Sequence, residues 1–197
     1  MKLPPVAVAP EGEHVPNLYP ATKFYDKSYT PGPKQQHLLE EMSKLVNELS
    51  SFIGLPITVG SGLRSAEDVV RLKSQGYNPA KKSDHFYGIP MPQDDGSMYA
   101  DSVGAADLYI KGLPGLFGHI VEHYLGITDP LARPHQIIYE TGHNGDWLHI
   151  ANPPLAAFTH EQAAKVLSKK PLLYSFDCGK TYVVFDPANP PEKLKKS

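Results

Sequence analysis

Three short segments carry side chains that could bind a metal. Two of these segments are predicted strands, so they also restrict the fold. AADLYI, at 105–110, alternates so that its apolar side chains face one way and Asp107 faces the other, which predicts a half-buried strand. DWLHIA, at 146–151, predicts a second strand that carries His149, and the upstream loop SDHFYG contains His85. Two imidazoles and one carboxylate are a typical set of protein ligands for catalytic zinc. The pattern therefore predicts that one loop and two strands meet at a metal.

The remaining sequence predicts one compact domain of the α+β class, in which a small, mostly antiparallel sheet packs with helices; a zinc site in a cleft is added only by the family resemblance described below. The length of 197 residues and a hydrophobic content of 41% suit one sizeable core. Helices are predicted over 34–53, 65–75, 113–125 and 159–169, strands over 57–59, 105–110, 135–140 and 146–151, and a final hairpin over 172–185.

Proline marks the two ends of the predicted domain. The chain has 20 prolines, about twice the average share, and seven of them fall within the first 33 residues. We therefore predict a proline-rich N-terminal arm at 1–30 that is either laid on the domain or loose, a single domain at 31–186 and a flexible tail at 187–197.

Charge and hydropathy argue against several classes of partner. The formal net charge is −2, without a long run of one sign, which favours neither nucleic acid nor an anionic membrane as a partner. No apolar run approaches the roughly 18 residues of a membrane span, and the N-terminus lacks the apolar stretch of a secretory signal. One cysteine excludes an internal disulfide framework. We therefore expect a protein that is soluble and cytoplasmic at synthesis.

Three motifs in a fixed order resemble those of a known peptidase family. SGLRS, then SDHFYG with GAADL, and then DWLHI have the order and approximate spacing of the zinc D-alanyl-D-alanine carboxypeptidase and dipeptidase family. That family belongs to the LAS-type metallopeptidases, named for lysostaphin, D-Ala-D-Ala metallopeptidases and sonic hedgehog. The resemblance covers residues 57–151, about half the chain, and extends to about residue 34 with the preceding helix.

The resemblance implies roles for seven residues. In the family, the histidine and aspartate of S-x-H-x-x-G-x-A-x-D bind zinc, and a later acid-x-x-H segment supplies a catalytic acid and the last ligand. An arginine, with its fixed fork of donors, suits a substrate carbonyl or a developing oxyanion. Carried over, the pattern makes His85, Asp107 and His149 the zinc ligands, Asp146 the general base and then acid, Arg64 the oxyanion-binding residue, and Ser83 and Trp147 parts of the substrate pocket.

Some of these residues have a plain structural alternative. Asp146 precedes His149 by three residues, and odd separations in a regular strand point to opposite faces. A base at Asp146 therefore requires an irregular start of the strand, which Gly145 would allow. Otherwise Asp146 closes a hairpin, His149 is a satisfied core histidine and Trp147 packs in the core.

The segment between the first two ligands is longer than in the family. The histidine and the aspartate are normally seven residues apart, whereas His85 and Asp107 are 22 apart. Fifteen extra residues, roughly 89–103, could form a lid, a specificity wall or a neutral surface excursion. The intact GAAD end favours Asp107 as the ligand, and the fallback ligands within the insertion are Asp94, Asp95 and Asp101.

Two alternatives to this site remain. HIVEH, at 119–123, matches the inverted zinc motif H-x-x-E-H. That peptidase class needs a distant third ligand and a larger chain, so a solvated helix face with two surface histidines is the favoured interpretation. The chain could also be a non-catalytic zinc-binding or virion module that keeps the fold for its shape. The presence of both Asp146 and Arg64 favours an enzyme over such a module.

The sequence therefore predicts a zinc metallopeptidase with one catalytic ion. The resemblance implies that its substrates are peptidoglycan stem peptides or related small peptides, cleaved at a bond involving D-amino acids. D,D-carboxypeptidase, D,D-dipeptidase and L-Ala-D-Glu endopeptidase activities all fit the motifs, as does the role of a phage-type endolysin. We expect a monomer whose partner is its peptide substrate.

Overall fold

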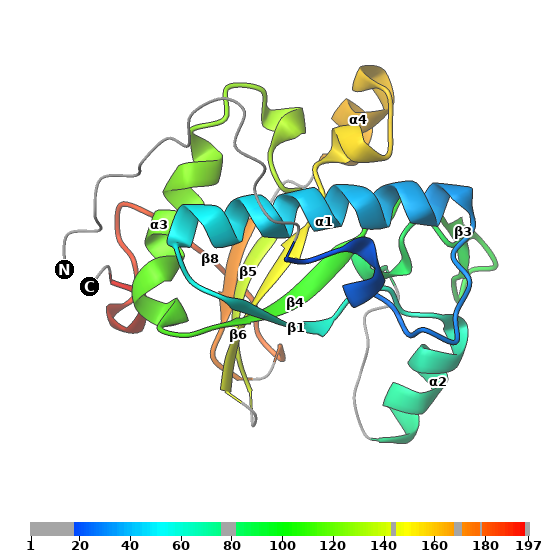
Figure 1. The fold of residues 1–197 in the computed structure, drawn as a ribbon, viewed down its shortest axis with the longest axis horizontal. Coiled ribbons are helices and arrows are strands. Elements are labelled where there is room, and N and C mark those ends of the chain that lie inside the picture. The colour runs from blue at the N-terminus through cyan, green and yellow to red at the C-terminus, as the bar shows by residue number, and fades with distance from the viewer. Residues whose placement is uncertain (1–17, 76–81, 143–144, 168–170, 178, 196–197) are drawn as a thin grey trace.

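The fold is an α+β arrangement in which helices cover one face of a six-stranded sheet (Figure 1). The computed structural model describes residues 18–75, 82–142, 145–167, 171–177 and 179–195. The strands of this sheet are β1 (Ile57–Ser61), β4 (Ala105–Ile110), β5 (Ile137–Gly142), β6 (Gly145–Ala151), β7 (Leu172–Ser175) and β8 (Val183–Val184). Their order is β1-β4-β6-β5-β7-β8, and all neighbours are antiparallel except β5 and β7. The predicted α+β class with a mostly antiparallel sheet is thus confirmed.

Local sequence signals explain where the helices begin and end. α1 (Pro33–Ile53) starts with proline and ends at Gly54, whose left-handed conformation (φ +65°) favours glycine. α2 (Ala66–Ser74) starts at the predicted capping box, in which Ser65 Oγ accepts from Asp68 N and the Asp68 carboxylate accepts from Ser65 N. No helix in the described part of the chain is long and apolar enough to cross a membrane. The other helices are α3 (Leu113–Leu125) and α4 (His160–Val166), and residues 168–170, where the last helix was predicted to end, lie outside the described residues.

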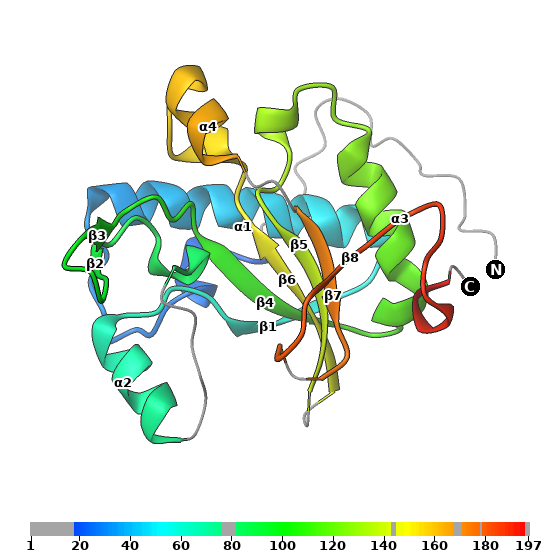
Figure 2. The same ribbon diagram turned by 180° about the vertical axis from the view of Figure 1, so that it is seen from behind.

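The main core lies between the sheet and the helices α1 and α3. Figure 1 shows α1 crossing in front of the sheet, and Figure 2 shows the sheet from its other side, with α1 behind it. Alternate residues of the central strands point toward the helices and are almost completely buried. These core residues are Ala106, Leu108, Ile110, Ile137, Tyr139, Leu148 and Ile150. The residues between them in the same strands therefore point to the opposite face.

The segment before α1 belongs to the domain. Tyr19 and Phe24 are buried in the main core, and the Tyr19 hydroxyl accepts a hydrogen bond from Ile57 N at 2.6 Å. Of the two forms predicted for the arm at 1–30, laid on the domain or loose, residues 18–30 take the first, because these two aromatic side chains anchor the segment. Residues 1–17 lie outside the described residues.

The C-terminal segment is anchored as well. The 3₁₀ turn η5 (Glu192–Leu194) packs against α3, and Leu194 is completely buried in the main core. The prediction of a flexible tail at 187–197 is therefore corrected as far as Lys195, because an apolar side chain docks the segment. The last two residues lie outside the described residues.

The insertion between the first two predicted ligands forms a small hairpin of its own, β2 (Met91–Pro92) with β3 (Met98–Tyr99). At its base, Gly88 N donates to the hydroxyl oxygen of the buried Ser102 at 2.7 Å. Val103 N donates to Asp84 Oδ1 at 3.1 Å. These bonds hold the two stems of the insertion together, so the segments before and after it stay in contact.

Candidate metal centre

His85, Asp107 and His149 come together on the face of the sheet opposite α1. Asp107 on β4 pairs in register with His149 on β6, so both side chains project from the same face. His85 reaches them from the 3₁₀ turn η2 (Asp84–Phe86). One ligand atom from each of these residues lies within 4.8 Å of the other two. The triad is largely buried and could hold a metal ion.

The hydrogen bonds of the triad leave a space with the chemistry of a cation site. His85 Nδ1 lies 2.7 Å from the Gly62 carbonyl oxygen; because this oxygen only accepts, the ring proton is on Nδ1. Burial lowers the pKa of His85, so the neutral ring presents the lone pair of Nε2 to Asp107 Oδ1 at 3.3 Å. Two facing acceptors favour a cation between them. A separation of about 3.3 Å also fits neighbouring ligand atoms around a tetrahedral zinc with bonds of about 2.0–2.1 Å.

The other two members of the triad share a hydrogen bond, with His149 Nδ1 3.0 Å from Asp107 Oδ1. Burial lowers the pKa of His149, but the hydrogen bond and charge of Asp107 outweigh burial and raise that pKa above its ordinary value of 6.5. Burial raises the pKa of Asp107, yet the two histidines outweigh this and hold it well below its usual range. Asp107 therefore supplies an ionised carboxylate at neutral pH.

The loop between β1 and α2 orients the Asp107 carboxylate. Arg64 Nη2 donates to Asp107 Oδ2 at 2.8 Å, and Ser61 Oγ donates to the same oxygen at 2.6 Å. The other carboxylate oxygen, Asp107 Oδ1, therefore faces His85 and His149. Gly62 lets the loop lie against the backbone of Phe24, because a Cβ at this position would clash with the Phe24 carbonyl oxygen. Arg64 thus lies at the triad, where its observed contact is with a ligand.

The turn that carries His85 is held by its neighbours. Ser83 is buried, and its hydroxyl oxygen accepts a hydrogen bond from His85 N as the cap of η2. Asp84 Oδ2 lies 3.0 Å from His135 Nδ1, and His135 Nε2 lies 3.0 Å from the Val166 carbonyl oxygen. The observed contact of Ser83 is therefore structural, and its role in a substrate pocket stays a prediction.

Asp146 lies on the opposite face of the sheet from the triad. Within the regular pairing of β5 and β6, Asp146 is opposite Thr141. Its Oδ1 accepts hydrogen bonds from the Thr141 hydroxyl at 2.8 Å and from Lys193 Nζ at 3.1 Å. The described part of β6 starts regularly, and Asp146 and His149 are three residues apart, so their side chains point to opposite faces. The assignment of Asp146 as general base is therefore corrected.

Trp147 points to the triad face and is half-buried outside the main core. It lies two residues before His149, and its ring centroid is 6.5 Å from that of Tyr109 on β4, at an interplanar angle of 57°. Tyr109 in turn covers Gly60 of β1, where an added Cβ would come within 2.5 Å of the tyrosine ring. Two aromatic rings therefore lie beside the ligands, as a substrate-binding role of Trp147 requires.

A buried carboxylate that the motifs did not predict shares this face. Glu140 on β5 pairs with Trp147, so it projects from the same face as His149 on the neighbouring strand. Its exposed fraction is 8%, and the Tyr182 hydroxyl donates to Glu140 Oε2 at 3.3 Å. The alternation of HQIIYE places Glu140 on one face of a strand, but only the pairing of β5 with β6 reveals that this face carries the triad.

The other candidate ligands lie apart from the triad. His123 of the HIVEH motif stacks on Phe52 with ring centroids 4.0 Å apart, and its Nε2 lies 2.9 Å from Glu48 Oε1. These contacts agree with a surface helix face. Among the described residues, no second group of metal-ligating side chains includes His119, His123 or the fallback aspartates Asp94, Asp95 and Asp101.

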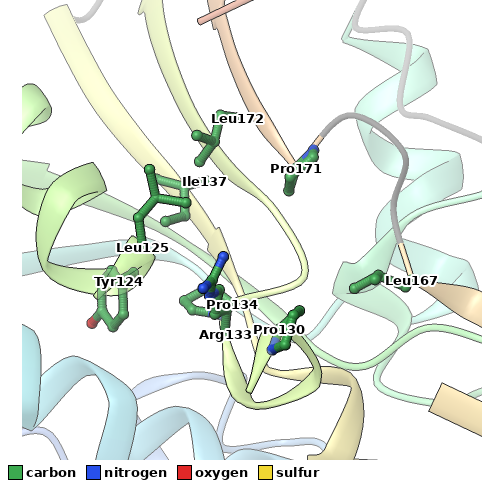
Figure 3. Close-up of a pocket in the computed structure, with 9 residues that line it drawn as sticks. All are labelled: Tyr124, Leu125, Pro130, Arg133, Pro134, Ile137, Leu167, Pro171 and Leu172. Atoms are coloured by element: carbon green, nitrogen blue, oxygen red, sulfur yellow. The ribbon is translucent and has the colours of Figure 1, made fainter. Parts of the chain in front are cut away.

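A hollow among the described residues lies away from the triad. It is a cavity of about 90 Å³ beside α3, the 3₁₀ turn η3 (Pro130–Ala132), β5 and β7 (Figure 3). Figure 3 shows apolar side chains around it, among them Leu125, Ile137 and Leu172, and no triad residue lines it. This cavity is therefore not the cleft that was predicted around the zinc.

The geometry provides two imidazoles, a carboxylate and an aromatic wall on one face of the sheet, an arrangement suited to metal-assisted hydrolysis. The resemblance of the three motifs rests on those residues alone. Comparison with protein-family models, curated proteins and solved structures finds no significant match.

Proposed function

We propose that this chain is a zinc metallopeptidase that hydrolyses peptidoglycan stem peptides or related small peptides at a bond involving D-amino acids. The observation that carries the proposal is the convergence of His85, Asp107 and His149, with one ligand atom from each within 4.8 Å of the other two. The proton that His149 Nδ1 shares with Asp107 Oδ1 would be displaced on zinc binding. Histidine and carboxylate ligands in a set of three are typical of catalytic zinc, whose fourth position stays open for water or substrate.

The residues around the triad support such a site. When bound, zinc would polarise the scissile carbonyl and lower the pKa of a bound water to roughly 7. The Gly62 carbonyl holds His85 in the tautomer that a ligand needs, and Arg64 and Ser61 orient the carboxylate of Asp107. Partners of this kind fix the direction of metal ligands and raise metal affinity.

The substrate class rests on the resemblance and on the surface beside the triad. Trp147 and Tyr109 offer an aromatic wall to the apolar side of a short peptide. A carboxypeptidase would release one D-Ala, a dipeptidase would act on free D-Ala-D-Ala, and an endopeptidase would cut between L-Ala and D-Glu. A metal held by the triad could assist hydrolysis of the peptide bond in each of these three reactions.

A non-catalytic zinc-binding or virion module is the second candidate. The position of Asp146 favours it, because the carboxylate expected to transfer protons lies on the other face of the sheet. The contact between Arg64 and Asp107 favours it too, because this arginine already has a structural partner. The two candidates share the zinc site and differ in hydrolysis.

Mass spectrometry of peptidoglycan fragments incubated with the zinc-loaded protein tests the proposal. The expected result is one zinc per chain and a new set of product masses that identifies the bond, with no products after removal of the metal by a chelator. Absence of stoichiometric zinc would contradict both the peptidase and a zinc-binding module, and would leave only a module that keeps the fold for its shape. One zinc per chain without any cleavage would favour the binding module.

A further inference from the structure

We infer that Glu140, on the triad face of β5, is the residue that transfers protons during peptide hydrolysis at this site. The inference rests on the proposed function and deepens it. Its starting point is the strand register, in which Glu140 pairs with Trp147 and lies diagonally across from His149. Diagonal neighbours on one face of a sheet are about 7–8 Å apart. This spacing suits a carboxylate that acts on a water molecule beside the triad.

Glu140 is buried without the partner that a structural carboxylate needs. Within the described part of the chain, no lysine, arginine or histidine forms an ion pair with Glu140, and the one hydrogen bond of its carboxylate comes from the Tyr182 hydroxyl. Burying a carboxylate with so little compensation is costly. Such costs are typical of functional sites, where an ionisable group must meet a substrate.

Two residues between β7 and β8, Gly179 and Tyr182, lie beside this carboxylate. Tyr182 reaches it from a half-exposed position, with its hydroxyl 3.3 Å from Glu140 Oε2. Gly179 lies against both groups, because an added Cβ would be 3.1 Å from Glu140 Oε2 and 2.8 Å from the Tyr182 hydroxyl oxygen. A glycine with φ +73° at this point keeps the space beside the carboxylate open.

The electrostatic surroundings of Glu140 suit a general base. Burial raises its pKa above the ordinary value of 4.5, and the charge of Asp107 adds to the rise, while His149 opposes it most strongly and Tyr182 and Arg64 oppose it less. A base whose pKa moves toward neutrality binds a proton more readily and still ionises at the working pH.

Asp146 has the opposite surroundings. Burial raises its pKa, but the hydrogen bonds of Tyr139, Thr141 and Lys193 outweigh burial and lower that pKa below 3.8. Asp146 is therefore the weaker base of the two, and it lies on the wrong face for the triad.

The proposed step balances without a further reactant. The oxygen of the attacking water bonds to the scissile carbonyl carbon, and Glu140 accepts one proton of that water. The protonated Glu140 then donates this proton to the amide nitrogen as the carbon–nitrogen bond breaks and the amine leaves. The other water proton remains with the new carboxyl group until that group ionises. Glu140 ends as a carboxylate, and no electrons are exchanged with an oxidant or reductant.

The test compares Glu140→Gln with Asp146→Asn in the zinc-loaded, full-length protein. The probes are the stem pentapeptide L-Ala-γ-D-Glu-L-Lys-D-Ala-D-Ala, free D-Ala-D-Ala and mixed muropeptides, with products measured by mass spectrometry. We expect Glu140→Gln to lower kcat by about 10²–10⁴-fold with little change in KM. We expect Asp146→Asn to keep most of the wild-type rate, as its place on the far face requires.

Zinc content and affinity, measured by competition with a chromogenic chelator, provide a readout besides activity. Glu140→Gln should keep one zinc per chain with weakened affinity, because a negative charge facing the triad is removed, whereas Asp146→Asn should bind zinc as the wild type does. A Glu140→Gln variant that has lost its zinc would overturn the inference, since the lost activity would then follow from the lost metal.

Tyr182→Phe is a second, milder variant that leaves both carboxylates in place. Its hydroxyl lowers the pKa of Glu140, so its removal should move the acidic limb of the kcat/KM profile to higher pH. An unmoved acidic limb would overturn the inference.

The outcomes separate the inference from the proposed function. A wild type that cleaves none of the probes contradicts the peptidase itself. A wild type that cleaves them while Glu140→Gln cleaves at the same rate overturns only the role of Glu140.

Discussion

Asp107 and His149 stand opposite each other on β4 and β6, and Asp107 Oδ1 lies 3.0 Å from His149 Nδ1. Two of the three candidate ligands are therefore placed by the register of a single strand pair. Core residues on the other face of these strands hold the register, because a slip by one residue would turn both polar side chains into the core. Only His85 has to be brought in from a loop.

Removing either histidine should abolish stoichiometric zinc binding. In His149→Ala, two protein ligands remain, fewer than the three that catalytic zinc sites use. The measurement is metal content by mass spectrometry after dialysis against limiting zinc. His123→Ala is the matched control, because this histidine stacks on Phe52 away from the triad, and it should keep its zinc. A zinc-replete His149→Ala protein would contradict the site.

Arg64→Ala should weaken zinc binding by about 10–100-fold, the usual effect of losing a partner that orients a metal ligand. The reason is that Arg64 Nη2 holds Asp107 Oδ2 at 2.8 Å. Chelator competition measures the change, and Arg71→Ala serves as control because that arginine pairs with Asp68 on the surface of α2. Unchanged zinc affinity together with a lowered kcat would instead support the oxyanion role implied by the resemblance.

The C-terminal segment should contribute to stability through one apolar side chain. Leu194→Ala removes a completely buried side chain and should lower the free energy of unfolding by about 2–5 kcal/mol. Lys193→Met is the neighbouring comparison: its pair with Asp146 is partly exposed, so its loss should cost about 1 kcal/mol or less. Urea unfolding measures both values. Equal costs would show that the tail is held by charge and not by burial.

His135 should make the stability of the domain decline as the pH rises above about 6.5. Burial lowers the pKa of His135, but the hydrogen bond and charge of Asp84 outweigh burial and raise it above 6.5. A raised folded pKa adds stability that is complete below the unfolded pKa and is lost as the pH rises through the folded value.

Urea midpoints across this range, in the presence of a chelator, test the prediction. The advantage of the wild type over His135→Gln should shrink as the pH rises. Because both proteins contain His149, the comparison isolates His135. A difference that stays constant with pH would contradict the prediction.

Local sequence signals predicted most of the helices and strands. The apolar stripe at 34–53 became α1 almost without change, and the alternation around Asp107 correctly placed that residue opposite the core face. Capping chemistry located the start of α2 at Ser65. These features are predictable because they depend on neighbours within a few residues.

The register between paired strands could not be predicted from local sequence patterns. The motif placed Asp146 near His149, whereas the regular register of β5 with β6 turns it to the other face. The same register brings Glu140 to the triad face from a strand without any recognised motif. Burial of Leu194 likewise depends on distant partners, so proline content alone misjudged the C-terminal end.

The base of the β2–β3 hairpin is closed by hydrogen bonds. His85 and Asp107 therefore stay close in space although they are 22 positions apart in the sequence. Because Gly88 and Ser102 meet at 2.7 Å, the stretch between them can lengthen or shorten in evolution without moving His85 or Asp107. The gap between the first two ligands is then a poor signature of common descent. Pattern searches for such sites should therefore gain sensitivity when they leave this gap free.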